Sequence, residues 1–290
     1  MPDSQLPPLV STEWLAARLG RADVRIVDGS WYLPSSGRDA AAEHAAEHIP
    51  GAVFFDLDAS SEAGTVLPHM LPAAAEFAAR MSALGLDDRS TIVVYDGSGV
   101  NLSAPRVWWT FRVFGHRAAA VLDGGLGKWK AEGRPLEPGV LRPAPGRFTA
   151  RLDPSRVRAL AAMRSNLGSG SEQVVDTRAA ERFEGREPEP RPGVRSGHIP
   201  GSLNLPFADL VSANGTFLPP ERLRARIEAA GLDPRRPVVA TCGSATSACS
   251  LVLALALLGH DGVAVYDGSW TEWGGRSDTP VEVGPVRRGA

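Results

Sequence analysis

The sequence predicts an α/β protein made of two copies of one domain, each a parallel sheet with helices on both faces. Three observations lead to this prediction. The same landmarks recur in the same order in the two halves, short β-branched segments alternate with helical patterns, and several of those patterns end in glycine. At 290 residues the chain is long enough for two domains of ordinary size.

Five landmarks occur once in each half and in the same order. They pair Asp28 with Asp176, His48 with His198, Asp96 with Cys242, His116 with His260, and Asp123 with Asp267. The spacings agree, since 20 residues separate Asp28 from His48 and 22 separate Asp176 from His198. The halves are joined by a proline-rich stretch that is typical of a semi-extended linker. We therefore predict an N-terminal domain over residues 1–137, a linker over 138–156 and a C-terminal domain over 157–290.

Short apolar segments that close on Asp, Gly or Cys predict the strands. They are rich in β-branched residues and do not alternate with polar ones, which is typical of strands buried on both faces of a parallel sheet. Each half contains three: residues 24–30, 91–97 and 118–125, then 173–179, 237–243 and 262–269.

Helical apolar patterns lie between these segments. They cover residues 11–20, 73–85 and 104–115 in the first half, and 219–231 and 247–259 in the second. Glycine, which readily takes the left-handed conformation after a helix, ends several of them. In such folds ligands bind beyond the carboxyl ends of the strands, so the residues that follow the strands are the candidates for a site.

Charge and cysteine content exclude several functional classes. With 31 Lys and Arg against 33 Asp and Glu the net charge is −2, whereas a nucleic-acid-binding surface usually needs a basic excess. No apolar run predicts a membrane span, and the N-terminus lacks the basic start and apolar core of a secretory signal. Two cysteines are too few for a disulfide framework. We therefore expect a cytoplasmic protein without a nucleic-acid or membrane partner.

Cys242 is the candidate nucleophile. It ends a predicted strand, and a loop of small residues, 243–247, leads from it into the apolar helix 247–259. The backbone N–H groups of such a loop and the positive end of the helix both favour a thiolate. The alternative is a buried structural cysteine at a strand end. Cys249 lies inside the apolar helix, where we expect it to pack in the core.

The composition of this loop narrows its chemistry. A cysteine phosphatase needs an arginine at the sixth position after the cysteine, where its paired donors grip phosphate. Here that position is Ala248, and no Lys or Arg lies between it and Cys242. In the first copy the cysteine position holds Asp96, whose carboxylate is not a sulfur-carrying nucleophile. We therefore expect the first copy to be inactive at that position.

Motifs along nearly the whole chain resemble the tandem rhodanese-domain sulfurtransferases. They are WYLP, GRDA, HIPGAVFFDLD, PHMLP, SAPRVWWTFRVFGH, EPEPR, GHIPG and the loop CGSATSA. The resemblance implies two rhodanese-like domains and a cysteine, here Cys242, that takes a sulfane sulfur from a small-molecule donor as a persulfide. The implied acceptor is thioredoxin, another thiol or cyanide. No cofactor is expected, and no metal-ligand spacing appears in the sequence.

The loop is most similar to that of the mercaptopyruvate-using members of the family, which read CGSGVTA. Thiosulfate-using members read CRKGVTA, and a dianionic donor benefits from the two cations that the present loop lacks. Gly243 matches the mercaptopyruvate form, while Ala245, Thr246 and Ser247 depart from it. These four residues form the expected substrate-binding loop. Ala245 would be strained if the loop required a positive φ at that position.

The resemblance also implies the remaining site residues. Ser244 matches the catalytic serine, which in the family works with a histidine and an aspartate of the first domain, here His69 in PHMLP and Asp58 in FFDLD. Arg182 and Arg191 match the pair that holds the carboxylate of the donor, a task suited to paired guanidinium N–H groups. From the residues alone, His69 is a loop histidine, Asp58 is a surface carboxylate, and both arginines belong to a solvated charged run.

Two other functions stay open at this point. One is a thiosulfate sulfurtransferase of the same fold, and the other is a non-catalytic sulfur carrier or binding module. The tryptophans lie in helical apolar patterns or after a strand, so we expect them to pack in cores rather than to form a ligand box. His48 and His198 occur in both copies, which indicates a structural role.

Overall fold

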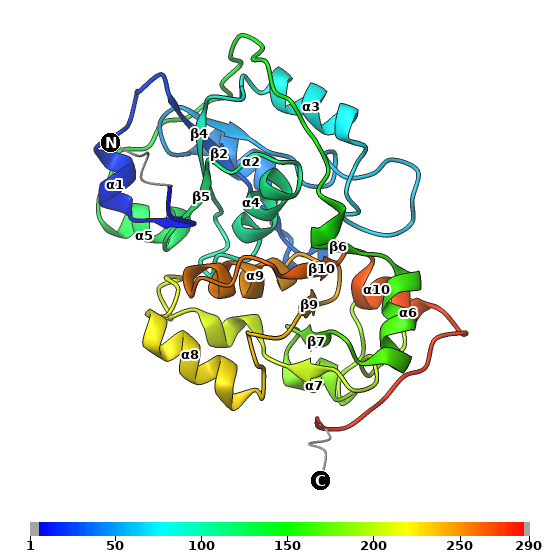
Figure 1. The fold of residues 1–290 in the computed structure, drawn as a ribbon. Coiled ribbons are helices and arrows are strands. Elements are labelled where there is room, and N and C mark those ends of the chain that lie inside the picture. Colours follow the sequence, from blue (N-terminus) through cyan, green and yellow to red (C-terminus); the bar gives the residue numbers. More distant parts are fainter. Residues whose placement is uncertain (1–5, 287–290) are drawn as a thin grey trace. The chain divides into compact units, whose positions relative to one another are not determined.

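The computed structural model describes residues 6–286, which divide into two compact units (Figure 1). Unit 1 holds the described residues up to Ala63 together with Leu71–Asp153 and Val211–Phe217. Unit 2 holds Gly64–Met70, Pro154–Leu210 and the described residues from Leu218 onward. Each unit thus includes one short segment that belongs to the other half of the sequence. Each half supplies one sheet, so the predicted α/β fold with two tandem domains is confirmed.

The sheet of unit 1 has five parallel strands in the order β1-β5-β4-β2-β3. The strands are β1 (Leu9–Val10), β2 (Val24–Asp28), β3 (Ala52–Phe54), β4 (Thr91–Tyr95) and β5 (Ala119–Leu122). The three longest were predicted, and they occupy the centre of the sheet. The edge strands β1 and β3 are two and three residues long, too short to show a pattern in the sequence.

The helices of unit 1 cover both faces of its sheet. They are α1 (Thr12–Ala16), α2 (Ala40–Ala46), α3 (Ala74–Ala83), α4 (Ala104–Val113) and α5 (Gly125–Ala131). On one face Leu15 of α1 and Trp129 of α5 join a buried cluster with Ile26 and Val93. Val94 points to the opposite face, because successive side chains of a strand alternate. There Val107 of α4 and Val94 both lie beside Gly29, within 3.2 Å of where a Cβ would stand.

The sheet of unit 2 repeats this arrangement. Its order is β6-β10-β9-β7-β8, again with every pair parallel. The strands are β6 (Val157–Arg158), β7 (Gln173–Asp176), β8 (Leu203–Asn204), β9 (Val238–Thr241) and β10 (Ala264–Tyr266). The helices are α6 (Leu160–Ser169), α7 (Ala180–Phe183), α8 (Pro220–Ala229), α9 (Ala248–Leu257) and α10 (Ser269–Gly275). Three single 3₁₀ turns, Pro34–Ser36, Pro154–Arg156 and Phe207–Leu210, complete the regular structure.

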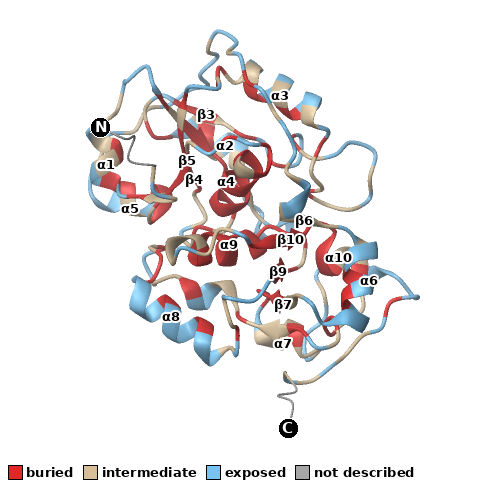
Figure 2. Ribbon diagram, in the orientation of Figure 1, coloured by how far each residue is buried: buried red, intermediate tan, exposed pale blue. Residues whose placement is uncertain are grey.

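Two helices of unit 2 differ in burial, as Figure 2 shows. α8 buries Leu223 and Ile227 and exposes most of its charged side chains. α9 is apolar along its length, and its residues Ala248–Leu255 are all buried. A helix that is apolar all round is buried on every side, so the first turn of α9 is fixed where β9 ends. Among the described residues, no helix is long and apolar enough to cross a bilayer.

Candidate functional site

Cys242 lies where the topology of unit 2 predicts a site. It directly follows β9, the central strand of the sheet, and only 2% of its surface is exposed. The loop from Gly243 to Ser247 then turns the chain into α9. Cys249 is also buried, and its Sγ donates to the Ala245 carbonyl at 3.2 Å, an internal bond one helical turn away. Only Cys242 of the two cysteines therefore stands at the carboxyl end of the sheet.

The first turn of α10 holds the carbonyl groups of the cysteine loop. The N–H of Trp270 donates to the carbonyl of Cys242 at 2.9 Å. Thr271 donates twice to the carbonyl of Gly243, through its N–H at 3.0 Å and its hydroxyl at 2.6 Å. The helix N-terminus has free N–H groups that need such acceptors. These bonds fix both peptide planes, so the carbonyls of the loop point toward α10.

Most backbone N–H groups of the loop from Gly243 to Ser247 have no acceptor among the described residues. The Ala245 N–H donates to the Ser269 hydroxyl at 3.0 Å. The N–H groups of Gly243, Ser244, Thr246 and Ser247 make no hydrogen bond to any part of the chain between residues 6 and 286. Buried N–H groups are almost always paired, and successive unpaired ones form an anion-binding concavity. The unpaired N–H groups of the loop are therefore suited to bind a negative charge beside Cys242, and we call this part of the loop the anion cradle.

Ala245 has a left-handed backbone in this loop. Its φ is 59°, and the side chain is fully buried. The corresponding residue of the first copy is Gly99, with a φ of 80°. The loop thus requires a positive φ at this position, and alanine occupies it at a cost that glycine avoids.

Replacing Ala245 with glycine should raise the free energy of unfolding by about 1 kcal/mol, since the left-handed strain is removed. The melting temperature should rise by about 2–4 °C. Ala248→Gly is the matched control, because Ala248 is equally buried but begins a right-handed helix, where glycine is destabilising. Thermal and denaturant unfolding of the two variants measure the effect. If Ala245→Gly destabilised as much as the control, the strain would be absent.

His69 meets the loop through its side chain. It lies in the segment Gly64–Met70, which belongs to unit 2 although it comes from the first half of the sequence. Its backbone is left-handed, with a φ of 61°, and 3% of its surface is exposed. Its Nδ1 lies 3.1 Å from the hydroxyl oxygen of Ser244 and 3.0 Å from that of Thr246. The structure therefore brings the expected serine and histidine into hydrogen-bonding distance.

Asp58 belongs to unit 1. It is exposed, and its Oδ2 accepts a hydrogen bond from the indole N–H of Trp31 at 3.1 Å.

Ser247, the last residue of the expected substrate-binding loop, lies within unit 2. Its hydroxyl is 3.1 Å from that of Thr177.

Arg182 and Arg191 converge on the loop beside the cysteine. A Cβ at Gly243 would lie 3.3 Å from Nη2 of Arg182 and 3.9 Å from Nη1 of Arg191. Arg182 is in α7, at the carboxyl side of β7, while Arg191 follows in the EPEPR motif. Glycine at position 243 is what permits this close approach. Two guanidinium groups are therefore placed next to Cys242, in a loop that has no cation of its own.

Replacing Gly243 with alanine should raise the KM for an anionic sulfur donor about 10-fold, because the new methyl group displaces the Arg182 guanidinium. The φ of Gly243 is not positive, so alanine causes no backbone strain there. Gly262→Ala is the control, since a Cβ at that position meets open space. Steady-state kinetics of both variants provide the measurement. An unchanged KM in Gly243→Ala would show that the arginines do not hold the donor.

The corresponding loop of unit 1 contains its own anion. Both oxygens of the buried Asp96 carboxylate accept backbone N–H groups, from Ser98 at 2.9 Å, from Ser103 at 2.9 Å and from Ala104 at 2.8 Å. Ser103 and Ala104 begin α4, the counterpart of α9. The carboxylate thus takes the place that an anion bound by the loop would occupy. This comparison supports the anion-cradle interpretation of the Cys242 loop.

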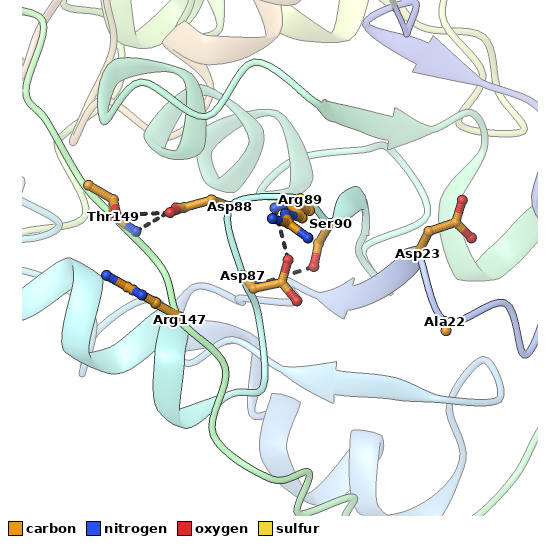
Figure 3. A pocket seen from close by; sticks show the side chains of 8 residues that line it. All are labelled: Ala22, Asp23, Asp87, Asp88, Arg89, Ser90, Arg147 and Thr149. Atoms are coloured by element: carbon orange, nitrogen blue, oxygen red, sulfur yellow. Dashed lines mark hydrogen bonds between the residues drawn. The ribbon is translucent and has the colours of Figure 1, made fainter.

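A surface cavity of about 640 Å³ in unit 1 is a separate feature (Figure 3). Asp23 and Ser90, which line it, immediately precede β2 and β4, so the cavity lies at the amino ends of these strands. Asp88 accepts the N–H and hydroxyl of Thr149, at 2.7 and 2.9 Å, and the backbone bond lowers the pKa of its carboxyl group. Ligands of α/β sheets bind at the opposite, carboxyl end. The Cys242 loop, at that carboxyl end, is therefore the candidate functional site.

Several contributors to the site were missed in the sequence. Ser269 and Thr271 hold the loop, and the buried Glu189 holds Arg182. The repeat offered a signal for the first two, because the first copy has Gly125 and Gly127 at the corresponding positions. At these two positions, hydroxyl side chains are present only in the copy that has the cysteine.

Comparison with known proteins agrees with this geometry. The family model described as "Rhodanese-like domain" matches residues 11–132 and 159–276. The human protein named 3-mercaptopyruvate sulfurtransferase is 47% identical, with 91% of each chain covered. The Bos taurus protein named thiosulfate sulfurtransferase is 43% identical over 91% of each chain. The crystal structure of a 3-mercaptopyruvate sulfotransferase, SseA from Escherichia coli, superposes with a TM-score of 0.84 at 35% identity, covering 91% of this chain and 99% of that one. The chain therefore belongs to the rhodanese family, has two tandem rhodanese-like domains, and is a sulfurtransferase.

Proposed function

We propose that the protein transfers a sulfane sulfur from 3-mercaptopyruvate, through a persulfide on Cys242, to a thiol or cyanide acceptor and releases pyruvate. The observation that carries this proposal is the pairing of a cation-free cysteine loop with two arginines that converge on Gly243. The name of the human relative supports the donor assignment. The catalytic copy is then the C-terminal domain, residues 157–290, and the N-terminal copy, with Asp96 in its loop, is inactive.

In the first step the Cys242 thiolate attacks the sulfur of the donor while Arg182 and Arg191 hold the donor carboxylate. A sulfur–sulfur bond forms, the carbon–sulfur bond breaks, and its electron pair passes to the carbon as the enolate of pyruvate. The proton of the donor thiol moves to that carbon, so the products are pyruvate and a deprotonated persulfide. Ser244, His69 and Asp58 are the groups we assign to this proton transfer. The free N–H groups of the loop stabilise the persulfide anion.

In the second step the thiolate of an acceptor attacks the outer sulfur of the persulfide. The sulfur–sulfur bond to Cys242 breaks, and the cysteine leaves as a thiolate, ready for the next donor. Thioredoxin or a small thiol fits this role, as does cyanide, which becomes thiocyanate. A cytoplasmic location suits the reaction, because thiols stay reduced there.

The competing donor is thiosulfate, the substrate named for the bovine relative. It is a dianion, and the CGSATSA loop has no Lys or Arg to compensate the second charge. We expect kcat/KM for mercaptopyruvate to exceed that for thiosulfate by about 10-fold or more. Steady-state assays with both donors and one acceptor give the ratio. A ratio at or below one would favour the thiosulfate enzyme, and no turnover of either donor would favour a sulfur carrier or binding module.

A further inference from the structure

A chain of four charges, three of them on buried side chains, leads to the cysteine loop within unit 2. Asp176 ends β7 and pairs with Arg178, Arg178 pairs with Glu189, and Glu189 pairs with Arg182. The side chains of the first three are 1%, 1% and 4% exposed, and that of Arg182 is 24% exposed. Buried charges require partners of this kind, because removing them from water costs several kcal/mol per ion.

Arg178 anchors this chain. Its Nε and Nη2 donate to Asp176 at 3.0 and 2.6 Å, Nη2 also donates to the carbonyl of Gly197 at 2.7 Å, and Nη1 donates to Glu189 at 2.7 Å. Its guanidinium also stacks on Trp270, 4.6 Å from the ring centre. Burial opposes the charge of Arg178, but the carboxylates of Asp176 and Glu189 outweigh burial and raise its pKa. Each of its three nitrogens donates to an acceptor of the chain, so Arg178 is placed to fix Glu189.

Glu189 in turn sets the direction of Arg182. Its Oε1 accepts from Nε of Arg182 at 3.2 Å, and its Oε2 accepts from Nη2, the paired geometry in which a carboxylate holds a guanidinium most firmly. The same Nη2 is the atom nearest to the Cβ position of Gly243. The remaining nitrogen of Arg182, Nη1, makes no hydrogen bond within residues 6–286. Glu189 thus directs Arg182 toward the loop and leaves one edge of it for a ligand.

The ion pair between Glu189 and Arg182 also reduces the net positive charge beside the cysteine loop. Arg182 brings one positive charge to the loop, but the two carboxylates and two guanidinium groups of the chain sum to zero, because Glu189 supplies the second negative charge. In the interior this compensation is strong, because few water molecules screen it. The donors differ in the same property, since mercaptopyruvate carries one negative charge on its carboxylate and thiosulfate carries two.

We propose that Glu189 is a positioning and specificity-determining residue: it holds Arg182 at Gly243 and limits the positive charge of the clamp to what a monoanionic donor requires. This inference deepens the proposed function and rests on it for the identity of the donor. Loss of the carboxylate should make the site more favourable for dianions relative to monoanions. A change of length without loss of charge should weaken binding of both alike.

The experiment measures anion binding without turnover. Pyruvate and sulfate serve as the monoanionic and dianionic probes, and each is titrated for its protection of Cys242 against the neutral reagent iodoacetamide at constant ionic strength. Peptide mass identifies the alkylated cysteine. The variants are Glu189→Gln, Glu189→Asp and Arg182→Gln. Glu187→Gln is the matched control, because this exposed glutamate lies two residues away in the same motif.

Glu189→Gln should shift the ratio of the two dissociation constants toward sulfate by about 10-fold or more, the effect of one unit charge at close range. Arg182→Gln should shift it in the opposite direction, and it keeps the test decisive if Glu189→Gln does not fold. Glu189→Asp and Glu187→Gln should leave the ratio within twofold of the wild type. The proposal is overturned if Glu189→Gln and Glu189→Asp change the ratio equally, or if Arg182→Gln leaves it unchanged. Failure to turn over mercaptopyruvate would refute the proposed function alone, because this assay needs no turnover.

Discussion

Replacing Cys242 with serine should lower sulfur transfer from either donor by about 10³-fold or more. The hydroxyl group is a much weaker nucleophile than a thiolate at neutral pH, and its oxygen cannot form the sulfur–sulfur bond that stores the transferred atom. The buried loop would otherwise be preserved, because serine and cysteine differ by one atom. Steady-state assays with mercaptopyruvate and with thiosulfate measure the loss, and circular dichroism establishes that the variant is folded.

Cys249→Ser is the control for this variant. Cys249 is fully buried in α9, and its Sγ donates to the carbonyl of Ala245 at 3.2 Å, a contact that a hydroxyl can reproduce. We expect turnover within about threefold of the wild type, since serine keeps this contact and the size of the side chain. Near-normal activity in Cys242→Ser, or a comparable loss in Cys249→Ser, would contradict the assignment of the nucleophile.

Removing the imidazole of His69 should lower kcat for mercaptopyruvate by about 10²-fold, which is typical of a lost proton-transfer group. Asparagine is the suitable replacement, because it tolerates the left-handed φ of 61° that this position adopts. Ser244→Ala should cause a similar loss. Since the two groups share one hydrogen bond of 3.1 Å, the double variant should be little worse than either single one.

Thr246→Val tests whether the contact with Ser244 is the one that matters. Thr246 lies as close to His69 Nδ1, at 3.0 Å, and valine has nearly the same shape without the hydroxyl group. We expect Thr246→Val to keep kcat within about threefold of the wild type. Pre-steady-state release of pyruvate separates the chemical step from acceptor binding. If Thr246→Val lost as much as Ser244→Ala, the proton path would run through the threonine.

Much of the fold could be predicted from the sequence because its central strands are continuous apolar runs. β2, β4, β7 and β9 all lie inside predicted segments. The edge strands were not predicted, since two or three residues carry no periodicity. The sequence also did not predict that residues 64–70 belong to unit 2 and residues 211–217 to unit 1. These loops have no apolar pattern, and their place depends on tertiary contacts alone.

The candidate site could be predicted only in part, because some of its residues meet only through tertiary contacts. Cys242 and its loop follow from position at a strand end. Strain at Ala245 was expected on the condition that the loop needs a positive φ there, and its φ of 59° meets that condition. Ser269 and Thr271 act on backbone atoms of a loop about 25 residues away, a relation that spacing does not encode. Glu189 stands in a run of charges and prolines that is typical of a solvated loop, yet its side chain is 4% exposed. Glu189 can be buried because its carboxylate pairs with Arg178, and this contact exists only in the folded structure.

The mass of the intact protein after reaction with a sulfur donor tests the central claim most directly. The protein is incubated with mercaptopyruvate or with thiosulfate, and each sample is then treated with a thiol. We predict a gain of one sulfur atom from mercaptopyruvate, located on Cys242 by peptide mass and removed by the thiol. A protein that gains no sulfur from either donor, or gains it at another residue, would contradict a persulfide mechanism at Cys242.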